Sequence, residues 1–207
     1  MKPGLALGIV VAAYLIGSIP FSYLIVKLVA HKDVRRVGSG NVGATNAMRA
    51  AGKKAGVIAL LLDLAKGIVA VLIARRIGAP PVLVGAAAVA AMLGHCYPVW
   101  LGFQGGKGVA TSAGALGALA PSALILALAA FAVVVAWKRY VSLGSIVAAA
   151  VFPLCIWIAQ RLGWEAREPW MLLSAALIAL IVIVKHRPNL ERMRQGIEPR
   201  LGERRTG

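Results

Sequence analysis

The chain has 207 residues, of which 60% are hydrophobic and 14% are charged. Soluble domains have about half apolar and about a quarter charged residues, so this composition excludes an ordinary soluble protein and predicts an integral membrane protein. A spanning helix needs about 20 residues, which leaves room for about five to seven helices and no separate soluble domain. The net charge of +16 fits short loops held beside anionic lipid at the cytoplasmic face. The basic residues are dispersed without a basic helix or an aromatic platform, so no nucleic-acid partner is expected.

The N-terminal run and the cysteines bear on processing and redox state. The first apolar run follows Lys2 as in a signal peptide, but it continues to about Val26 with no Ala-x-Ala cleavage pattern. We therefore expect it to stay as the first helix. Cys96 and Cys155 are too few for a disulfide framework or a zinc site, and we interpret both as packing residues.

Apolar runs of spanning character follow one another along the chain. In order, they are Leu5–Val26, Ala55–Ala74, Pro80–Leu101, Val109–Leu119, Ser122–Trp137, Leu143–Gln160 and Trp170–Val184. The fourth is short, and it is separate from the fifth only if the chain turns at Pro121. A proline inside a helix removes a hydrogen bond and clashes with the preceding turn, but membrane helices tolerate kinks. Local chemistry therefore leaves the number of spans open.

The distribution of Lys and Arg favours one topology. With a turn at Pro121, 16 of the 23 basic residues lie in inner loops and five in outer loops, while Lys27 and Lys66 lie within spans. If residues 109–137 formed one span, nine would be inside and 12 outside. Because basic residues concentrate on the cytoplasmic side, we predict an all-α bundle of seven transmembrane helices, with the N-terminus outside and the C-terminus cytoplasmic. Residues 1–207 are expected to form one membrane-embedded domain with a basic cytoplasmic tail from about residue 186.

Two features of the spans predict packing. Asp63 and Lys66 lie three residues apart on one helical face, where they can pair within the bundle. An ionisable residue in a span is a functional candidate, but we favour a structural role because acid and base neutralise each other. Small residues at Ala86, Ala90 and Gly94 predict close helix packing in the third span.

The first polar stretch, Gly38–Arg49, reads GSGNVGATNAMR. It combines hydrogen-bonding side chains, glycines that let a ligand approach the backbone, and an arginine that can clamp a phosphate. The candidate binding residues are Ser39, Gly40, Asn41, Gly43, Thr45, Asn46 and Arg49. The alternative is a glycine turn in which Thr45 or Asn46 caps the next helix, although a cap requires one such residue and this stretch has several.

The second polar stretch, Gly102–Thr111, reads GFQGGKGVAT and leads into an apolar run. A loop of this kind at the start of a helix turns several backbone N–H groups toward one point, where the helix dipole also favours an anion. The expected phosphate cradle consists of Gly105, Gly106, Lys107 and Gly108. The alternative is that these glycines serve helix packing. Just upstream, His95 is more typical of a hydrogen-bonded structural residue than of a base.

Two more polar stretches flank the last two spans. Lys138–Ser145 is a short basic turn that is also typical of an interfacial anchor. Lys185–Glu198 follows the last span and places His186 and Asn189 where that span meets the cytoplasm, and from Arg200 onward we expect a solvated tail. In the seven-span topology three helix N-termini face the cytoplasm together with these cations. That arrangement favours more than one bound phosphate and therefore a two-substrate reaction.

At these residues the chain resembles the bacterial acyl-phosphate:glycerol-3-phosphate acyltransferases, often called PlsY. The resemblance rests on GSGNxGATNxxR, GHxxPV…GGKGVAT and HRxNxxR…GxE, in order and spacing from Gly38 to Glu198. It implies acyl transfer from a fatty acyl phosphate to the 1-hydroxyl of sn-glycerol 3-phosphate, giving lysophosphatidic acid and inorganic phosphate, the first step of bacterial phospholipid synthesis. It also implies no thioester donor, no metal, no cofactor and no obligatory protein partner, and an active site at the cytoplasmic face of the bacterial inner membrane.

Carried over by motif, the resemblance implies a role for each matched residue. Ser39 and Arg49 are similar to the essential pair of the first motif, and His186 and Asn189 to the active-site pair of the third. The other matched positions are Gly105, Gly106 and Lys107 for the phosphate loop, Glu198 for a mainly structural acid, and Lys138 and Ser142 for a less closely matched binding stretch.

The residues themselves disfavour catalysis by a base dyad or a nucleophilic triad. Acyltransferases that use thioesters carry His-x4-Asp as a base dyad, and none of the three histidines here has an Asp five residues on. We therefore expect catalysis by positioning and phosphate neutralisation, with either His186 or the acceptor's own phosphate as the base. Two other classes stay open: a transporter of a phosphorylated metabolite and a scaffold that binds lipid headgroups. The sequence shows no convincing internal repeat, which disfavours the transporter.

Overall fold

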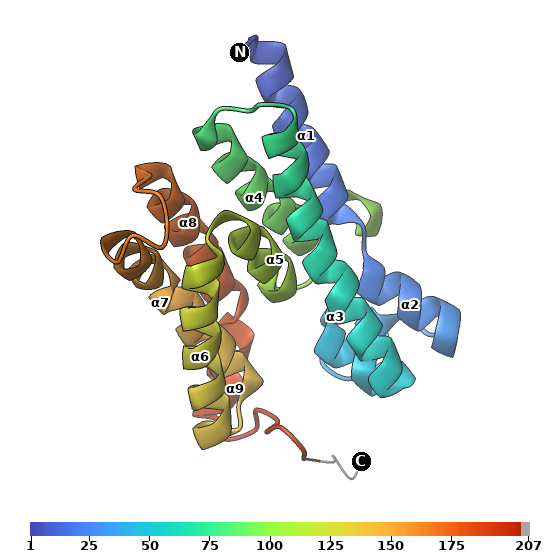
Figure 1. Cartoon of the computed structure of the whole chain (residues 1–207). Helices are drawn as coiled ribbons and strands as arrows, with labels where there is room; N and C mark the ends of the chain where they lie inside the picture. The colour runs from blue at the N-terminus through green and yellow to red at the C-terminus, as the bar shows by residue number, and fades with distance from the viewer. Residues whose placement is uncertain (204–207) are drawn as a thin grey trace. The chain divides into compact units, whose positions relative to one another are not determined.

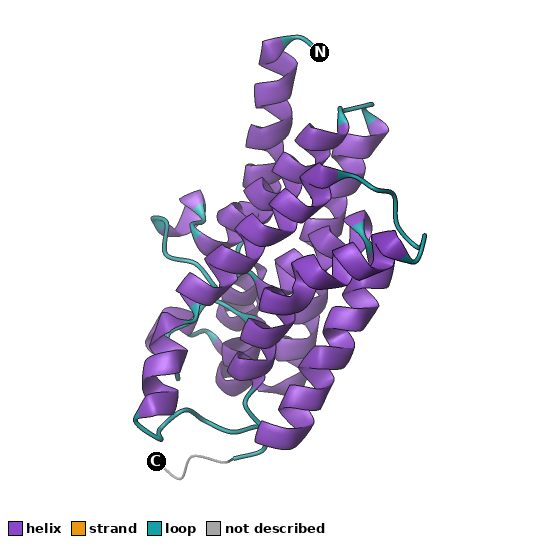
Figure 2. Ribbon diagram, turned by 90° about the vertical axis from the view of Figure 1, so that its left-hand side faces the viewer, coloured by secondary structure: helices purple, strands orange, loops and turns teal. Residues whose placement is uncertain are grey.

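The structure is a computed structural model, and it describes residues 1–203. Every regular element in this range is helical (Figure 2). In chain order the elements are α1 (Pro3–Ser18), α2 (Phe21–Ala30), the 3-10 turn η1 (Val34–Arg36), α3 (Ala44–Arg76), α4 (Pro81–Cys96), the 3-10 turn η2 (Val99–Leu101), α5 (Val109–Leu119), α6 (Pro121–Lys138), α7 (Val141–Arg161), α8 (Pro169–Lys185) and α9 (Arg187–Arg194).

Proline and glycine explain several helix boundaries. Helices α1, α4, α6 and α8 each carry a proline in the first turn, where its missing N–H costs no hydrogen bond. The predicted break at Pro121 is confirmed, because α5 ends at Leu119 and α6 begins at Pro121. Helix α3 is interrupted at Gly52, whose φ of 89° suits glycine.

The helices confirm an all-α membrane protein, whereas the number of spans stays a prediction. Five helical stretches within residues 1–203 are long and apolar enough to cross a membrane: residues 3–30, 44–76, 81–101, 121–138 and 141–161. Helices α8 and α9 make a sixth if this pair, bent by 48°, is one span. The predicted fourth span is the 11-residue helix α5, which at about 1.5 Å per residue is shorter than the roughly 30 Å hydrocarbon core. The orientation of the termini also stays a prediction.

The chain divides into two compact units, one up to Leu119 and one from Ala120. In the first unit, α1 packs along α4, and α3 packs against α2, α4 and α5 (Figure 1). The predicted close packing of the third span is confirmed, since a Cβ added at Gly94 would meet the backbone of Ser18 and Gly17 of α1. Gly17 in turn lies against the backbone of Ala91. The α1–α4 contact therefore depends on small residues from both helices.

The second unit is built on α7, which packs against α6 and α8, with α9 following α8 after the bend. Gly144 near the start of α7 lies against Phe131 and Val135 of α6. Large apolar side chains point outward on these spans, and Ile125 is 68% exposed and Val133 66% exposed. An outward apolar surface on membrane-length helices is the surface that lipid chains cover.

Candidate functional site

The first polar loop is organised by the side chain of Asn46, which is 1% exposed. Its Oδ1 accepts a hydrogen bond of 3.1 Å from the Ser39 backbone N–H. Its Nδ2 donates bonds of 2.9 Å to the carbonyl oxygens of Val34 and Val37. Gly38, with a φ of 58°, passes so close that a Cβ there would lie 2.5 Å from Asn46 Oδ1. The side chain of Asn46 therefore stabilises the conformation of the loop through its backbone. A direct substrate contact by Asn46 stays a prediction.

The other predicted residues of this loop lie nearer to solvent. Ser39, Thr45 and Arg49 are exposed, and Asn41 and Gly43 are half-buried. The N-cap of α3 is Gly43, and no side chain caps this end. The alternative interpretation of Thr45 or Asn46 as the cap is therefore wrong, because the amide of Asn46 is turned into the loop instead.

The glycine loop is held between the end of α4 and the first polar loop. The Gly106 N–H donates a hydrogen bond of 3.1 Å to the carbonyl of His95. A methyl group added at Gly106 would overlap both His95 Nε2 and the carbonyl oxygen of Val42. Gly108, with a φ of 77°, lies against Met92 and the thiol of Cys96. The structure thus brings the first and second motifs into contact at Gly106.

This close approach explains the residue types of the second motif. Gly106 is buried, while Gly105 and Lys107 are half-buried. A Cβ at Gly105 would also collide with the backbone of α4, at the carbonyl of His95. The alternative was that these glycines serve only helix–helix packing. They instead let the loop before α5, which begins at Val109, pack against α4. Lys107 follows directly on the two packed glycines.

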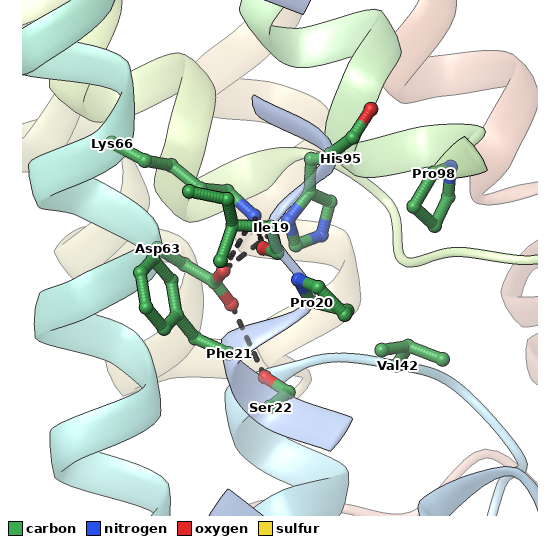
Figure 3. A pocket seen from close by; sticks show the side chains of 10 residues that line it. Ile19, Pro20, Phe21, Ser22, Val42, Asp63, Lys66, His95 and Pro98 are labelled. Atoms are coloured by element: carbon green, nitrogen blue, oxygen red, sulfur yellow. Dashed lines mark hydrogen bonds and ion pairs between the residues drawn. The ribbon is translucent and has the colours of Figure 1, made fainter. Parts of the chain in front are cut away.

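A buried ionic cluster lies beside this loop, within the first unit (Figure 3). The predicted pair is confirmed, since Lys66 Nζ lies 2.8 Å from Asp63 Oδ1. Two partners from other helices were not predicted: Ser22 Oγ donates to Asp63 Oδ2 over 3.1 Å, and His95 Nδ1 lies 3.5 Å from Asp63 Oδ1. The sequence marked His95 as part of the GHxxPV motif and as a hydrogen-bonded structural residue, but it did not indicate Asp63 as its neighbour.

In the second unit the central polar group is the carboxylate of Glu198. Its Oε1 accepts hydrogen bonds from Ser142 Oγ (2.7 Å) and Asn189 Nδ2 (2.6 Å), and its Oε2 accepts one from Arg192 Nε (2.7 Å). Burial on its own would raise the pKa of Glu198, but these three hydrogen bonds and the charge of Arg192 lower it below the ordinary value. The carboxylate thus joins the start of α7 to α9, which supports the structural role predicted for Glu198.

His186 and Lys138 have different surroundings in the same unit. His186 is 2% exposed, and its Nδ1 lies 2.8 Å from the Val182 carbonyl. A carbonyl accepts hydrogen bonds, so Nδ1 carries the proton and the lone pair of a neutral ring is on Nε2. Lys138 is exposed, and its Nζ lies 3.9 Å from the centre of the Trp137 ring. Lys138 therefore has the surroundings of an interfacial anchor, and its predicted contact with substrate stays a prediction.

The predicted tail is more ordered than expected. The Leu201 N–H donates to the Arg139 carbonyl over 2.6 Å, and Arg139 Nη2 donates to the Leu201 carbonyl over 2.8 Å. Arg200 Nε donates to the Tyr140 hydroxyl over 3.3 Å. Residues 200 and 201 are exposed, as expected of a solvated tail, and these contacts also hold them on the α6–α7 turn. The end of the predicted tail, residues 204–207, lies outside the described part of the chain.

The last expectations concern metal-binding side chains and the two cysteines. Within residues 1–203, no group of three His, Cys, Asp or Glu side chains is placed to hold a metal ion. Within the same residues Cys96 and Cys155 are buried and form no disulfide, which agrees with the interpretation of both as packing residues.

The family model for glycerol-3-phosphate acyltransferase matches residues 7–196. A glycerol-3-phosphate acyltransferase of Syntrophotalea carbinolica is 48% identical over 191 residues, which cover 91% of this chain and 94% of the relative. One from Geobacter sulfurreducens is 46% identical over 188 residues, with coverage of 91% and 93%.

Two crystal structures of PlsY, an integral membrane glycerol 3-phosphate acyltransferase, have the same fold. The glycerol 3-phosphate form superposes with a TM-score of 0.86 at 42% identity and covers 95% of this chain and 96% of that chain. The lysophosphatidic acid form has a TM-score of 0.84 at 41% identity, with coverage of 95% for both chains. The match to the family model and the identity to these relatives extend over nearly the whole chain, so this membrane protein belongs to the glycerol-3-phosphate acyltransferase family.

Proposed function

We propose that the protein transfers an acyl group from a fatty acyl phosphate to the 1-hydroxyl of sn-glycerol 3-phosphate. The hydroxyl oxygen attacks the acyl carbonyl, the carbon–oxygen bond to phosphate breaks, and a base takes the hydroxyl proton. The products are lysophosphatidic acid and inorganic phosphate. The observation that carries this proposal is the contact at Gly106 between the glycine loop and the first polar loop of this chain, which belongs to the glycerol-3-phosphate acyltransferase family. The relatives' crystal forms with glycerol 3-phosphate and with lysophosphatidic acid are consistent with this acceptor and product.

Phosphate neutralisation is the main catalytic contribution in this proposal. Both substrates carry phosphate, and the departing phosphate gains charge in the transition state. Backbone N–H groups of the glycine loop other than that of Gly106, which is bonded to the His95 carbonyl, stabilise with Lys107 an anion that develops there. Ser39 on the neighbouring loop supplies a hydroxyl for a second phosphate, and Arg49 near the start of α3 supplies a guanidinium. Preorganised donors of this kind lower the barrier because they need no rearrangement as the charge develops.

His186 and Asn189 also take part in the proposed reaction, as their match to the third motif implies. The lone pair on His186 Nε2 can accept a hydrogen bond from an acceptor hydroxyl, which makes this nitrogen one of two candidate bases. The other is the phosphate of glycerol 3-phosphate itself. Replacing His186 with Asn separates them, because a histidine base gives a pH–rate profile whose acid limb is lost in the variant, whereas a phosphate base leaves that limb in place.

We also propose that the protein acts in the bacterial inner membrane with its binding loops facing the cytoplasm, as one membrane-embedded domain without an obligatory protein partner. The positive-inside distribution of Lys and Arg supports this orientation. The exposed apolar faces of the spans support membrane lipid as the surrounding partner.

The test is phosphate release by the purified full chain in detergent or a lipid mesophase. The protein is supplied with palmitoyl phosphate, with and without glycerol 3-phosphate, and in parallel with palmitoyl-CoA. Phosphate release that requires glycerol 3-phosphate, together with no thiol release from palmitoyl-CoA, would support both the reaction and the donor class. Absence of turnover with either donor in folded protein would contradict the proposal and would favour the transporter, which uptake assays in liposomes would then test.

A further inference from the structure

The buried cluster of Ser22, Asp63, Lys66 and His95, here called the Asp63 cluster, has no substrate contact in the proposed reaction. Asp63 is 1% exposed and Lys66 is 4% exposed. The cavity beside them has a volume of about 10 Å³, roughly the room that one water molecule needs. It is much too small for a phosphate ester. Any contribution of the cluster to the reaction must therefore act through neighbouring groups.

Stability alone is a weak reason for a buried ion pair. The cost of removing two charges from water often exceeds their attraction, and well-packed apolar residues of similar volume are often as stable. A charged pair inside a spanning helix is therefore a candidate for a role beyond packing. The neighbours of the pair indicate what that role is.

One neighbour is the break between α1 and α2. Helix α1 ends at Ser18 and α2 begins at Phe21, with Pro20 between them. Lys66 Nζ donates a hydrogen bond of 2.9 Å to the Ile19 carbonyl, which lies at this break. Ser22, in the first turn of α2, donates to Asp63. The ion pair thus satisfies polar groups that the helix break leaves inside the protein.

The other neighbour is the glycine loop, which the cluster reaches through His95. Figure 3 shows the His95 ring beside Asp63 and Lys66. The Nδ1 edge of the ring lies at Asp63, and the Nε2 edge lies against Gly106. Gly106 also donates its N–H to the carbonyl of the same histidine and lies against the carbonyl of Val42 on its other side. The backbone just before Lys107 is therefore confined by His95 and the first polar loop.

We infer that Asp63 and His95 are positioning residues, in which Asp63 orients the His95 ring and the ring holds Gly106 so that the loop presents Lys107 and its backbone N–H groups to a phosphate. The inference rests on the proposed function of the glycine loop. The chemical reason is that an anion cradle is effective only when its donors are already aimed, so a loop free to move by about 1 Å loses roughly 10- to 100-fold in catalytic efficiency.

The test uses the paired variant Asp63→Asn/Lys66→Met in the full-length protein. It removes both charges together, so no unpaired buried charge is left, but it also removes the hydrogen bond from Lys66 to the Ile19 carbonyl. We therefore expect the variant to fold with an apparent Tm several degrees below that of wild type. We expect the KM for palmitoyl phosphate to rise about tenfold or more, with kcat changed less than KM. A second variant, His95→Asn, keeps an amide near the Nδ1 position and shortens the side chain that contacts Gly106. It should show the same rise in KM.

The combination of the variants tests whether Asp63 acts through His95. If it does, adding His95→Asn to the paired variant raises KM no further, whereas independent effects multiply. Glu191→Gln, an equally conservative change of an exposed acid, is the control and should behave as wild type. An unchanged KM in folded Asp63→Asn/Lys66→Met would overturn the inference. So would a loss of kcat that follows a fall in Tm without a change in KM. Wild-type protein that fails to turn over would instead contradict the proposed reaction.

Discussion

Replacing Glu198 with Gln changes one charge and almost no volume, at a carboxylate that receives three hydrogen bonds. If the Gln oxygen stays where Ser142 and Asn189 donate, its NH₂ group faces the Nε–H of Arg192, and that bond is lost. The opposite orientation loses two bonds. The smallest expected loss is thus one charge-assisted hydrogen bond, about 1.5–3 kcal/mol. For a chain of this size, that lowers the apparent Tm by roughly 3–12 °C.

The variant also has a pH signature. The pKa of Glu198 is lowered in the folded protein, so its contribution to stability is present above the unfolded value of about 4.3 and is lost as the pH falls below it. Wild type should lose stability over this acid range, and Glu198→Gln should lose less because it has no such group to protonate. Thermal unfolding in detergent from about pH 7 down to pH 3.5, with activity at pH 7, measures both effects.

The matched control is Glu191→Gln on α9, the helix that ends just before Glu198. Glu191 is exposed, accepts a hydrogen bond of 2.8 Å from Gln195 and lies 4.0 Å from Arg194. Removal of an exposed charge of this kind changes stability by less than about 1 kcal/mol. A Glu198→Gln protein with the Tm, acid sensitivity and kinetics of wild type would refute the assignment of Glu198 as the group that holds Ser142 and Asn189.

Three further outcomes are expected. Gly106→Ala should lower kcat/KM about tenfold or more, because its methyl group overlaps His95 and Val42 and overpacking costs about 1–3 kcal/mol. The control is Gly8→Ala, where nothing lies within 4 Å of the added carbon. Equal kinetics in the two variants would contradict the argument that crowding at Gly106 lowers activity. Lys107→Ala should raise the KM for a phosphate substrate about tenfold or more, or abolish activity, with an unchanged Tm, and wild-type kinetics would remove Lys107 from the site. Addition of EDTA to the enzyme assay should leave the rate unchanged, and a rate restored only by added metal would overturn the metal-free mechanism.

Patterns that depend on neighbours in the chain were readable from the sequence. Helical runs follow from hydropathy, and the Asp63–Lys66 pair follows from the spacing of one helical turn. The break at Pro121 was predicted from the distribution of Lys and Arg, because the chemistry of proline alone left it open. The motifs located both glycine-containing loops for the same reason, since each loop is a continuous stretch. The number of spans could not be settled in this way, because the 11 residues of α5 satisfy hydropathy but form a helix shorter than the hydrocarbon core of a bilayer.

Contacts between residues far apart in the chain were decided only by the tertiary structure. Spacing did not predict that His95 would lie between Asp63 and Gly106, because α3, α4 and the glycine loop meet only after the helices pack. The same holds for Ser142 and Glu198, which are 56 residues apart. The sequence determined that Asn46 carries an amide, but the packing of α3 against η1 decided that this amide turns inward to hold its own loop. Residue types and local periodicity thus determined the helices and the chemical groups, while burial and packing determined which of those groups hold one another in place.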